Sequence, residues 1–528
     1  MNSLEKTQAL ETAYNDIPYT SVAFPHCQPN RLQALAKLKG LNPPELDNAR
    51  VLEIGCSFGG NLIPFAIRYP NSQIVGIDLS EIQINIGQKM MQEIGLNNVH
   101  LVAADISKVN FENLQFDYII CHGVFSWIPE FVQNAILQLI QTYLTPNGVA
   151  FISYNAYPGW HLKDMVKELM QFGTSSDIHH YERIDQAKEL FAQTETLLER
   201  FHPQTKPEFS RIAQHIQDAD KYYVAHEYLE EINQPFYFHQ FIKKITPYGL
   251  GYITDTSLPS TKTLNIFSGE KYEQLCQYFH RDIVKIEQYT DFINQRPFRC
   301  SILTHQHNLN GYNIDKYDMV HEFYELYIKG NLTKSDDNSH WLLPNGNQAF
   351  ASFPLSDELA KVLNENTVPY PIKELFPLLA KNEEDKNTLT KLLVALVHQE
   401  SMYISYHTEE LAPFGEYPKL SDKFERLIKF VKDNPNITKL SSIYGQPIEF
   451  NVFTLYLVKH LDGNHSLDAL NNIIRKAFEN DELTLNREGK PVPYAEIQDK
   501  EISDMLNGTL QYLQNLGYFN NYNEEQQC

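Results

Sequence analysis

The chain has 528 residues and a net charge of −22, with 42% hydrophobic and 21% charged residues. This length and composition are typical of a globular protein with several domains. The acidic balance argues against a nucleic-acid backbone as the main partner, because such binding depends on Lys and Arg side chains that neutralise phosphates. An acidic surface would suit a basic, lysine-bearing polypeptide substrate, although solubility alone would also explain it.

The cysteines and the lengths of the apolar runs indicate the expected cellular location. The six cysteines are scattered without a C-x-x-C pair, which excludes a zinc ribbon and disfavours a disulfide framework. The first residues are polar and lack a signal-peptide core, and no uncharged apolar run approaches the ~18 residues of a membrane span. We therefore expect a cytoplasmic protein without membrane insertion. The sequence indicates no oligomeric state.

An aromatic segment precedes the first predicted strand. It contains Tyr14, Tyr19, Phe24 and His26 and belongs to residues 1–40. Two interpretations stay open for this N-terminal arm. It would either cover a ligand site, with Tyr14 and Tyr19 contacting a substrate, or simply pack on the core.

Residues 51–80 form the most informative stretch. Residues 51–54 are a short apolar strand, residues 55–60 a tight turn that opens a helix, and residues 74–77 a second strand that Asp78 closes. This order is typical of a nucleotide-binding βαβ unit. Small residues in the turn let the backbone approach a ligand, and the helix start offers free N–H groups. Asp78 would accept hydrogen bonds from both ribose hydroxyls.

Three chemistries compete for this turn. Gly55-x-Ser57-x-Gly59 also spells a hydrolase nucleophile elbow, but no strong strand precedes the first predicted one. The glycine spacing does not fit the G-x-G-x-x-G turn that binds pyrophosphate. An S-adenosylmethionine (SAM) site wants an acid near the end of the first strand for the cationic amino-acid end of the ligand, and Glu53 lies there. We favour SAM, with a generic nucleotide fold as the alternative.

The alternation of helix and strand continues after Asp78. Apolar periodicity predicts helices at 82–94 and 131–143 and strands at 99–103, 116–121 and 149–154. A polar break at 145–148 is expected between the second helix and the last strand. The predicted fold is α/β, a Rossmann-like, doubly wound and mainly parallel sheet with its ligand at the carboxyl ends of the strands.

Each strand end then has an expected role at the cofactor. Asp105 would accept from the adenine amino group, with Ala104 and Ile106 beside the ring, although a lone Asp at a strand end is more often a turn former. The segment 122–127 would wall the adenine and the methyl-bearing sulfonium. The expected cofactor contacts are Glu53, Gly55, Ser57, Gly59, Asn61, Asp78, Leu79, Gln83, Ala104, Asp105, Ile106, His122 and Gly123.

The acceptor side is expected after the fifth strand. Methyl transfer from a sulfonium mainly requires alignment of the nucleophile and removal of its proton. For a lysine acceptor, moving the pKa from ~10.4 to ~7 costs roughly 4.6 kcal/mol, which an apolar aromatic channel would supply by desolvation. We assign catalytic roles to Asn155, Tyr157 and Trp160. The alternative is a Tyr-Pro-Gly turn with a buried Trp.

The rest of the chain divides into further segments. Residues 162–230 are predicted to be largely helical, and 251–254 and 301–304 to be strands. His226-Glu227-x-x-Glu230 falls short of the zincin H-E-x-x-H motif, and no metal is expected. Two C-terminal segments with helices followed by a strand or hairpin suggest winged helices. We predict an arm at 1–40, a SAM-binding domain at 41–220, an α+β regulatory or substrate domain at 221–308, and helical modules at 316–420 and 421–528.

Several motifs resemble a known family. They include Glu53-Ile54-Gly55-Cys56, Gly59-Gly60-Asn61-Leu62, the run from His122 to Trp127, the run from Ser153 to His161, and the run from His226 to Asn233 with Tyr237-Phe238-His239. These resemble bacterial class I methyltransferases with a methyltransferase regulatory domain, specifically over about residues 14–305. The best-known members methylate lysines of outer-membrane proteins.

The resemblance implies SAM binding around Glu53, Gly55, Gly59, Asp78 and Asp105, and a middle domain that seats a protein substrate. Expected substrate contacts are Tyr14, Tyr19, Phe125, Trp127, His226 and Tyr237. Ser57 stands where the family usually has glycine. A small hydroxyl residue should fit there, with a weaker turn or an altered turn dipole as the alternative. The absence of an N-P-P-Y signature disfavours amide or DNA-amine methylation. We predict a SAM-dependent protein-lysine methyltransferase. The alternatives are methylation of a small molecule or lipid precursor, and a non-catalytic SAM-binding regulator.

Overall fold

The computed structural model describes residues 20–519, apart from 176–177, 179, 231, 257–268, 311–318, 409–410 and 488. The predicted substrate contacts Tyr14 and Tyr19 lie outside the described residues.

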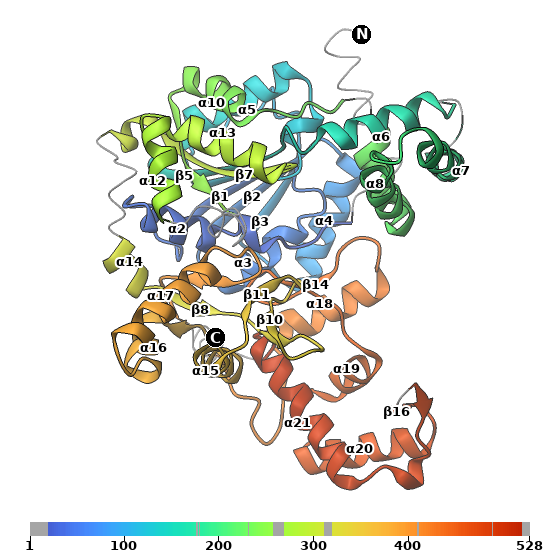
Figure 1. Ribbon diagram of the computed structural model, residues 1–528. Helices are drawn as coiled ribbons and strands as arrows, with labels where there is room; N and C mark the ends of the chain where they lie inside the picture. The colour runs from blue at the N-terminus through green and yellow to red at the C-terminus, as the bar shows by residue number, and fades with distance from the viewer. Residues whose placement is uncertain are drawn as a thin grey trace.

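A seven-stranded sheet forms the centre of the molecule (Figure 1). Its order is β3-β2-β1-β4-β5-β7-β6; the first five pair in parallel, and β7 runs antiparallel to both β5 and β6. The predicted Rossmann-like, mainly parallel sheet is confirmed. The strands are β1 (Arg50–Ile54), β2 (Gln73–Asp78), β3 (Val99–Ala103), β4 (Phe116–Cys121), β5 (Leu144–Asn155), β6 (Leu250–Asp255) and β7 (Phe298–His305).

Helices cover both faces of this sheet, as a doubly wound fold requires. On one face, α2 (Pro29–Leu38), α3 (Ile63–Arg68) and α4 (Glu81–Ile94) bury their apolar sides against the strands. On the other face lie α5 (Glu130–Tyr143) and α10 (Phe238–Ile245), with α13 (Ile283–Asn294) packed on α10. In Figure 1 these two groups lie below and above the sheet.

Two features of the sheet differ from the sequence prediction. The expected break at 145–148 is wrong, because β5 already begins at Leu144 and a register shift against β4 absorbs the extra residues. Strands β6 and β7 belong to the segment predicted as a separate middle domain, yet they complete the central sheet. Sequence distance concealed this, since about 140 residues separate β5 from the strand that pairs with it. The boundary at 220 stays a prediction.

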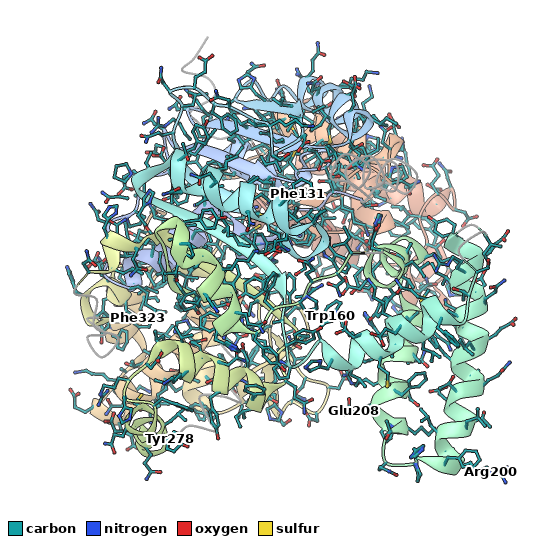
Figure 2. The ribbon with its side chains drawn as sticks, turned by 90° about the horizontal axis from the view of Figure 1, so that it is seen from above. Phe131, Trp160, Arg200, Glu208, Tyr278 and Phe323 are labelled. Carbon is teal, nitrogen blue, oxygen red and sulfur yellow. The ribbon has the colours of Figure 1, made fainter. Side chains whose placement is uncertain are left out.

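A helical insert leaves the sheet after β5. It comprises α6 (His161–Phe172), α7 (His180–Phe201), α8 (Lys206–Asp218), α9 (Lys221–Val224) and the π-helical turn η4 (Ala225–Leu229). Its apolar side chains form a core of their own, separate from the two sheet faces. The predicted helical character of 162–230 is confirmed. Figure 2 places Trp160 where the insert leaves the sheet and Arg200 near its outer end.

After the insert, α12 (Gly269–Tyr278) precedes α13, and α14 (Met319–Tyr324) opens the C-terminal region. This region then contains two small sheets, β12-β8-β13 and β11-β10-β9. The segment 331–347, whose Asn, Asp, Ser and Gly residues are typical of a loop, therefore contains two short strands. The elements are β8 (Tyr327–Lys329), β9 (Thr333–Lys334), β10 (His340–Leu342), β11 (Gln348–Ala351), α15 (Pro354–Glu365), β12 (Tyr370–Pro371), α16 (Ile372–Leu379), α17 (Glu383–Val397) and β13 (Tyr403–Ser405).

The last part of the chain has the predicted helices and hairpin, together with α18 (Asp422–Asp433), which the sequence analysis missed. Ser421 caps this helix by accepting from the Phe424 N–H, a start signal that the sequence carries. The remaining elements are β14 (Leu440–Ser441), β15 (Pro447–Ile448), α19 (Val452–Leu457), α20 (Leu467–Glu479), β16 (Asn486–Arg487), β17 (Lys490–Pro491) and α21 (Asp499–Asn515).

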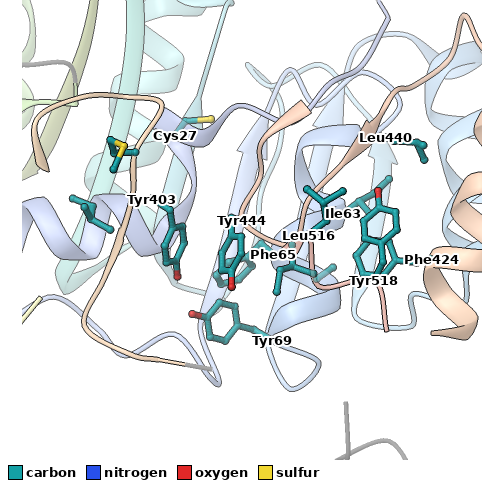
Figure 3. Packing of buried hydrophobic residues seen from close by; sticks show 14 of the residues in the cluster. Cys27, Ile63, Phe65, Tyr69, Tyr403, Phe424, Leu440, Tyr444, Leu516 and Tyr518 are labelled. Atoms are coloured by element: carbon teal, nitrogen blue, oxygen red, sulfur yellow. The ribbon is translucent and has the colours of Figure 1, made fainter. Parts of the chain in front are cut away.

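The C-terminal region packs directly on the domain that contains the central sheet. Figure 3 shows Tyr403 and Tyr444 facing Phe65 and Tyr69 from the α3 side of the sheet. The Arg68 guanidinium lies 4.8 Å from the Tyr403 ring centroid and 5.7 Å from that of Tyr444. This aromatic contact joins the two regions into one continuous apolar core.

A buried arginine adds a polar tie between regions that are distant in the sequence. The Arg31 guanidinium on α2 donates to the carbonyl oxygens of Thr256, Val397 and Met402 at 2.8, 3.4 and 3.2 Å. A buried cation needs such acceptors, so α2, the end of β6 and the C-terminal region are held together. None of the described helices has the length and apolar character needed to cross a membrane.

Candidate active site

A cavity of about 580 Å³ opens at the carboxyl ends of the parallel strands. Its size falls within the range of small-molecule and cofactor sites, and its position is the one predicted for an open α/β sheet. Of the predicted site residues, those that line it are Glu53, Gly55, Ser57, Asn61, Asp78, Leu79, Gln83, Ala104, Asp105, Ile106, His122, Gly123, Trp127, Asn155, Trp160 and His226.

The turn after β1 depends on its small residues. Gly55 has φ +75°, and a Cβ there would lie 2.3 Å from a Val124 methyl group. Gly59 has φ +83° and caps the helical turn that follows, but it does not line the cavity. Ser57 also has a positive φ, +51°. That conformation favours glycine, so the departure from the family glycine costs backbone strain.

Asp78 joins this turn to the end of β2. Its Oδ2 accepts from the Ser57 N–H at 2.8 Å, and its Oδ1 accepts from the Ser80 N–H at 3.0 Å. Burial raises the pKa of Asp78, although these backbone donors oppose the shift. The carboxyl group is therefore held at the cavity by the main chain.

Glu53 is a buried acid whose hydrogen-bonding capacity is only half used. Its Oε1 accepts from Asn61 Nδ2 at 2.7 Å, whereas its Oε2 has no hydrogen-bond partner in the part of the chain that the structure describes. Burial raises the pKa of this carboxyl group to about 8. A buried carboxyl with a free oxygen fits the cationic amino-acid end of SAM.

Asp105 proves to be a turn former that also faces the cavity. Its Oδ1 accepts from the Ser107 N–H at 3.0 Å and from the Ser107 hydroxyl at 2.6 Å, and Lys108 Nζ lies 2.8 Å from Oδ2. Burial alone would raise the pKa of Asp105, but these donors outweigh it and lower the pKa. Asp105 is thus an ionised acceptor at the strand end.

The N-terminal segment closes one side of the cavity. Phe24 and His26 line it, and their rings lie 4.3 and 4.7 Å from the His122 ring. The Phe24 N–H donates to Asn61 Oδ1 at 2.8 Å, which fixes the segment to the turn after β1. Burial lowers the pKa of His26 to about 4, and it lowers the pKa of His122 well below its ordinary value. These uncharged rings form one wall of the cavity. Of the two interpretations of the N-terminal arm, this segment therefore fits the one in which the arm covers a ligand site.

The opposite wall comes from the end of β5 and the helical insert. Trp160 is 1% exposed, and Trp127 lies edge-on to it with ring centroids 6.2 Å apart. Asn155 Nδ2 donates to Asn233 Oδ1 at 2.9 Å, and the Asn155 carbonyl accepts from the Phe236 N–H at 2.9 Å. His226 Nδ1 lies 3.2 Å from Glu230 Oε1. This wall combines large aromatic faces with carboxylates.

Besides Gly59, three predicted residues lie away from the cavity. Tyr157 stacks on His161 at 4.1 Å and donates its hydroxyl hydrogen to Asp164 at 2.7 Å. Tyr237 contacts the same histidine, 3.0 Å from its Nε2. Phe125 is fully buried in the core on the α5 side of the sheet. Since none of the three lines the cavity, the structure gives their predicted roles no support.

The sequence analysis missed Lys163, Glu227 and Glu230 as site residues, although all three line the cavity. The spacing along the helix is a signal for Lys163, which follows Trp160 by three residues and so shares its helix face. Glu227 and Glu230 belong to a motif that resembles a metal site, but their carboxylates can equally bind an ammonium group. Within the described residues no group of three or more His, Cys, Asp or Glu side chains is placed to hold a metal ion.

Comparison with known proteins agrees with this architecture. Three family models match in succession: "Methyltransferase domain" over residues 45–223, "Predicted methyltransferase regulatory domain" over 220–305, and "PKMT, C-terminal winged helix domain" over 416–518. The predicted winged helix in the last module has this match as support.

Relatives extend the similarity over the whole chain. The uncharacterized protein RP789 of Rickettsia prowazekii is 31% identical over 517 residues, which cover 95% of this chain and 92% of that protein. The solved structure of PKMT2 from Rickettsia typhi matches with a TM-score of 0.77 at 29% identity, covering 95% of this chain and all of that one. The same protein in complex with AdoHcy matches with a TM-score of 0.76 at 28% identity and the same coverage.

The family predicted from the motifs is therefore confirmed, and with it SAM as the cofactor. The chain belongs to the bacterial SAM-dependent methyltransferases that carry a methyltransferase regulatory domain and a C-terminal winged helix domain.

Proposed function

We propose that this methyltransferase acts on lysine side chains of a protein substrate. The observation that carries the proposal is that one cavity joins the strand-end acids Asp78 and Asp105 to a wall of Trp160, Glu227 and Glu230. Aromatic faces and carboxylates together favour an ammonium group. The likeness to PKMT2 over 95% of the chain and the matching PKMT winged helix model support a protein-lysine acceptor.

The cofactor side of the cavity has the groups that SAM requires. Asp78 would hold the ribose hydroxyls, Asp105 the adenine amino group, and Glu53 the cationic amino-acid end through its free oxygen. Bound SAM supplies a methyl group already activated by a sulfonium. The remaining work of the protein is to align the acceptor nitrogen and keep it unprotonated.

The apolar surroundings of the acceptor side serve that second task. Trp160 and Trp127 form its aromatic surface. Burial of an amine against this surface disfavours its charged form and opposes the stabilisation of the ammonium by Glu227 and Glu230. We also propose a cytoplasmic location, since the five described cysteines are buried free thiols. Cell fractionation with an antibody against the chain tests the location.

Methyl-labelled SAM tests the acceptor class. The purified protein is incubated with cell extract, and with the same extract after its protein amines have been blocked by acetylation, which leaves no nucleophilic nitrogen on lysine. We expect label in protein bands of the first extract and its loss in the second, with tandem mass spectrometry placing the methyl groups on lysine. Label in the organic phase would instead support a small-molecule or lipid-precursor acceptor. No label with retained SAM binding would support a regulator.

A further inference from the structure

One lysine of the chain lies inside the cavity with its ammonium group already bound. Lys163 Nζ is 4.2 Å from the centroid of the Trp160 ring and 3.0 Å from Glu227 Oε1. All three side chains line the cavity that contains Asp78. The contacts combine a cation–π interaction with a charge-assisted hydrogen bond, which are the two interactions that recognise a lysine ammonium.

The same wall retains an unused donor. Trp160 is buried, and its indole Nε1 has no hydrogen-bond partner among the residues described in the structure. A buried indole N–H usually has one. This N–H is itself enclosed by the protein, so the part of Trp160 available to a ligand is the ring face that Lys163 now covers.

A second lysine near the cavity, Lys167, has a structural role and serves as a comparison for Lys163. Lys167 Nζ lies 5.5 Å from the Trp127 ring centroid and donates to the Glu230 carbonyl at 2.6 Å, and this residue is buried. Lys163 instead is 23% exposed and pairs with the side chain of Glu227, which is 17% exposed. A side-chain pair with solvent access exchanges partners more readily than a buried bond to the main chain.

We propose that Trp160 and Glu227 form the binding site for the acceptor ammonium, and that Lys163 occupies this site as an internal competitor. An incoming lysine takes over the face of Trp160 and the carboxylate of Glu227, and the Lys163 side chain turns out to solvent. Lys163 keeps Glu227 paired when no acceptor is present, so that no uncompensated carboxylate remains in the apolar wall. This inference rests on the proposed lysine acceptor.

If Lys163 competes with the acceptor, its replacement should strengthen acceptor binding. If Lys163 instead supports the site, its replacement should weaken acceptor binding. In Lys163→Met the aliphatic stem remains and the charge is lost, so the site is open. We expect the KM for a methylated acceptor protein to fall about fivefold, as for the loss of one exposed ion pair, with SAM affinity unchanged. In Glu227→Gln we expect the KM to rise about tenfold or more, because a charge-assisted bond is lost.

Binding of n-butylammonium, the end of a lysine side chain, tests the site without any methyl transfer. Saturation-transfer NMR on the full chain saturated with S-adenosylhomocysteine measures its Kd, with n-butanol as the uncharged probe. We expect Lys163→Met to bind n-butylammonium about fivefold more tightly and Glu227→Gln to bind it more weakly. Affinity for n-butanol should change little in either variant.

Two further variants separate the site from general effects. Lys163→Arg retains a cation over Trp160 and is expected to bind no more tightly than the wild type. Lys221→Met breaks an exposed pair with Asp185, 2.7 Å long, elsewhere in the helical insert, and should change nothing. An unchanged or weaker n-butylammonium affinity in a folded Lys163→Met variant overturns the inference. Tighter binding without any protein methylation would leave the site intact and refute the proposed function instead.

Discussion

The cavity has two walls that are built in different ways. We call the side with Glu53, Asp78 and Asp105 the cofactor wall, and the side with Trp160, Lys163 and Glu227 the acceptor wall. On the cofactor wall, main-chain N–H groups of Ser57 and Ser80 hold the carboxyl group of Asp78 at the end of a buried strand. On the acceptor wall, side chains hold side chains, as in the Lys163–Glu227 pair. Main-chain bonds fix a geometry that suits one cofactor, whereas side-chain pairs can be exchanged when a substrate enters. The sheet therefore provides contacts with a fixed geometry, and the helical insert provides contacts that can change when a substrate binds.

The largest expected effect comes from breaking the cofactor wall. Asp78→Ala removes the acceptor that we propose for the ribose hydroxyls and the partner of the Ser57 N–H. We therefore expect SAM binding to weaken about a hundredfold or more, as for the loss of two hydrogen bonds to a charged group. Calorimetry with S-adenosylhomocysteine measures it. Asp117→Ala is the matched control, because Asp117 accepts from the Arg50 N–H at 2.8 Å outside the cavity. Unchanged affinity in a folded Asp78→Ala protein would contradict the assignment.

A change in the acceptor wall should lower activity toward the acceptor without changing cofactor affinity. In Trp160→Leu the aromatic face is lost, and we expect kcat/KM for the acceptor to fall about tenfold or more, with cofactor affinity within about twofold. Tyr157→Phe is the comparison, since its hydroxyl bonds Asp164 away from the cavity. From the sequence we expect catalytic roles for both residues, but of the two only Trp160 lines the cavity. Equal losses in both variants would show that the loop acts as a unit, and a lost cofactor affinity would show that the walls are not independent.

The same division explains what the sequence could predict. Glu53 and Asp78 lie at the ends of strands that apolar runs identify, and Asp105 comes two residues after the next strand. The carboxyl ends of parallel strands meet at one edge. The acceptor wall has no such rule. Lys163 and Glu227 are 64 residues apart and meet only because α6 packs against the π-helical turn η4, and no periodicity of the sequence encodes that contact.

The protonation of Glu53 refines the description of the cofactor wall. Burial raises its pKa to about 8, so the carboxyl group is mostly protonated at pH 7 in the free protein. The cationic end of SAM favours the carboxylate, and binding should release a proton. Calorimetric enthalpies in phosphate and Tris at pH 7 should then differ in proportion to the ionisation enthalpies of the buffers, and Glu53→Gln should abolish the difference. Equal enthalpies for the native protein would mean that Glu53 is already ionised.

The stability of the free protein gives an independent check of this pKa. The folded value lies above the ordinary 4.5, so the folded state binds the proton more tightly than the unfolded state does. The stability from protonated Glu53 is therefore fully present below pH 4.5 and is lost as the pH rises through about 8. Denaturant unfolding between these values should show a decline that is smaller in Glu53→Gln.

The smallest expected effect tests whether the cofactor wall depends on the C-terminal region. Thr438 lies in the segment matched by the winged helix model, and its Oγ1 donates to the Ser21 carbonyl at 2.8 Å. The Ser21 hydroxyl in turn accepts from the Gly60 N–H at 2.8 Å, beside the turn that follows β1. In Thr438→Val this link loses one hydrogen bond, and we expect S-adenosylhomocysteine affinity to fall about two- to fivefold. Thr142→Val makes the same chemical change at an exposed helix position, where Oγ1 donates to the Gln138 carbonyl at 2.8 Å. If calorimetry gives both variants the affinity of the wild type, the C-terminal region supports the fold without acting on the cofactor site.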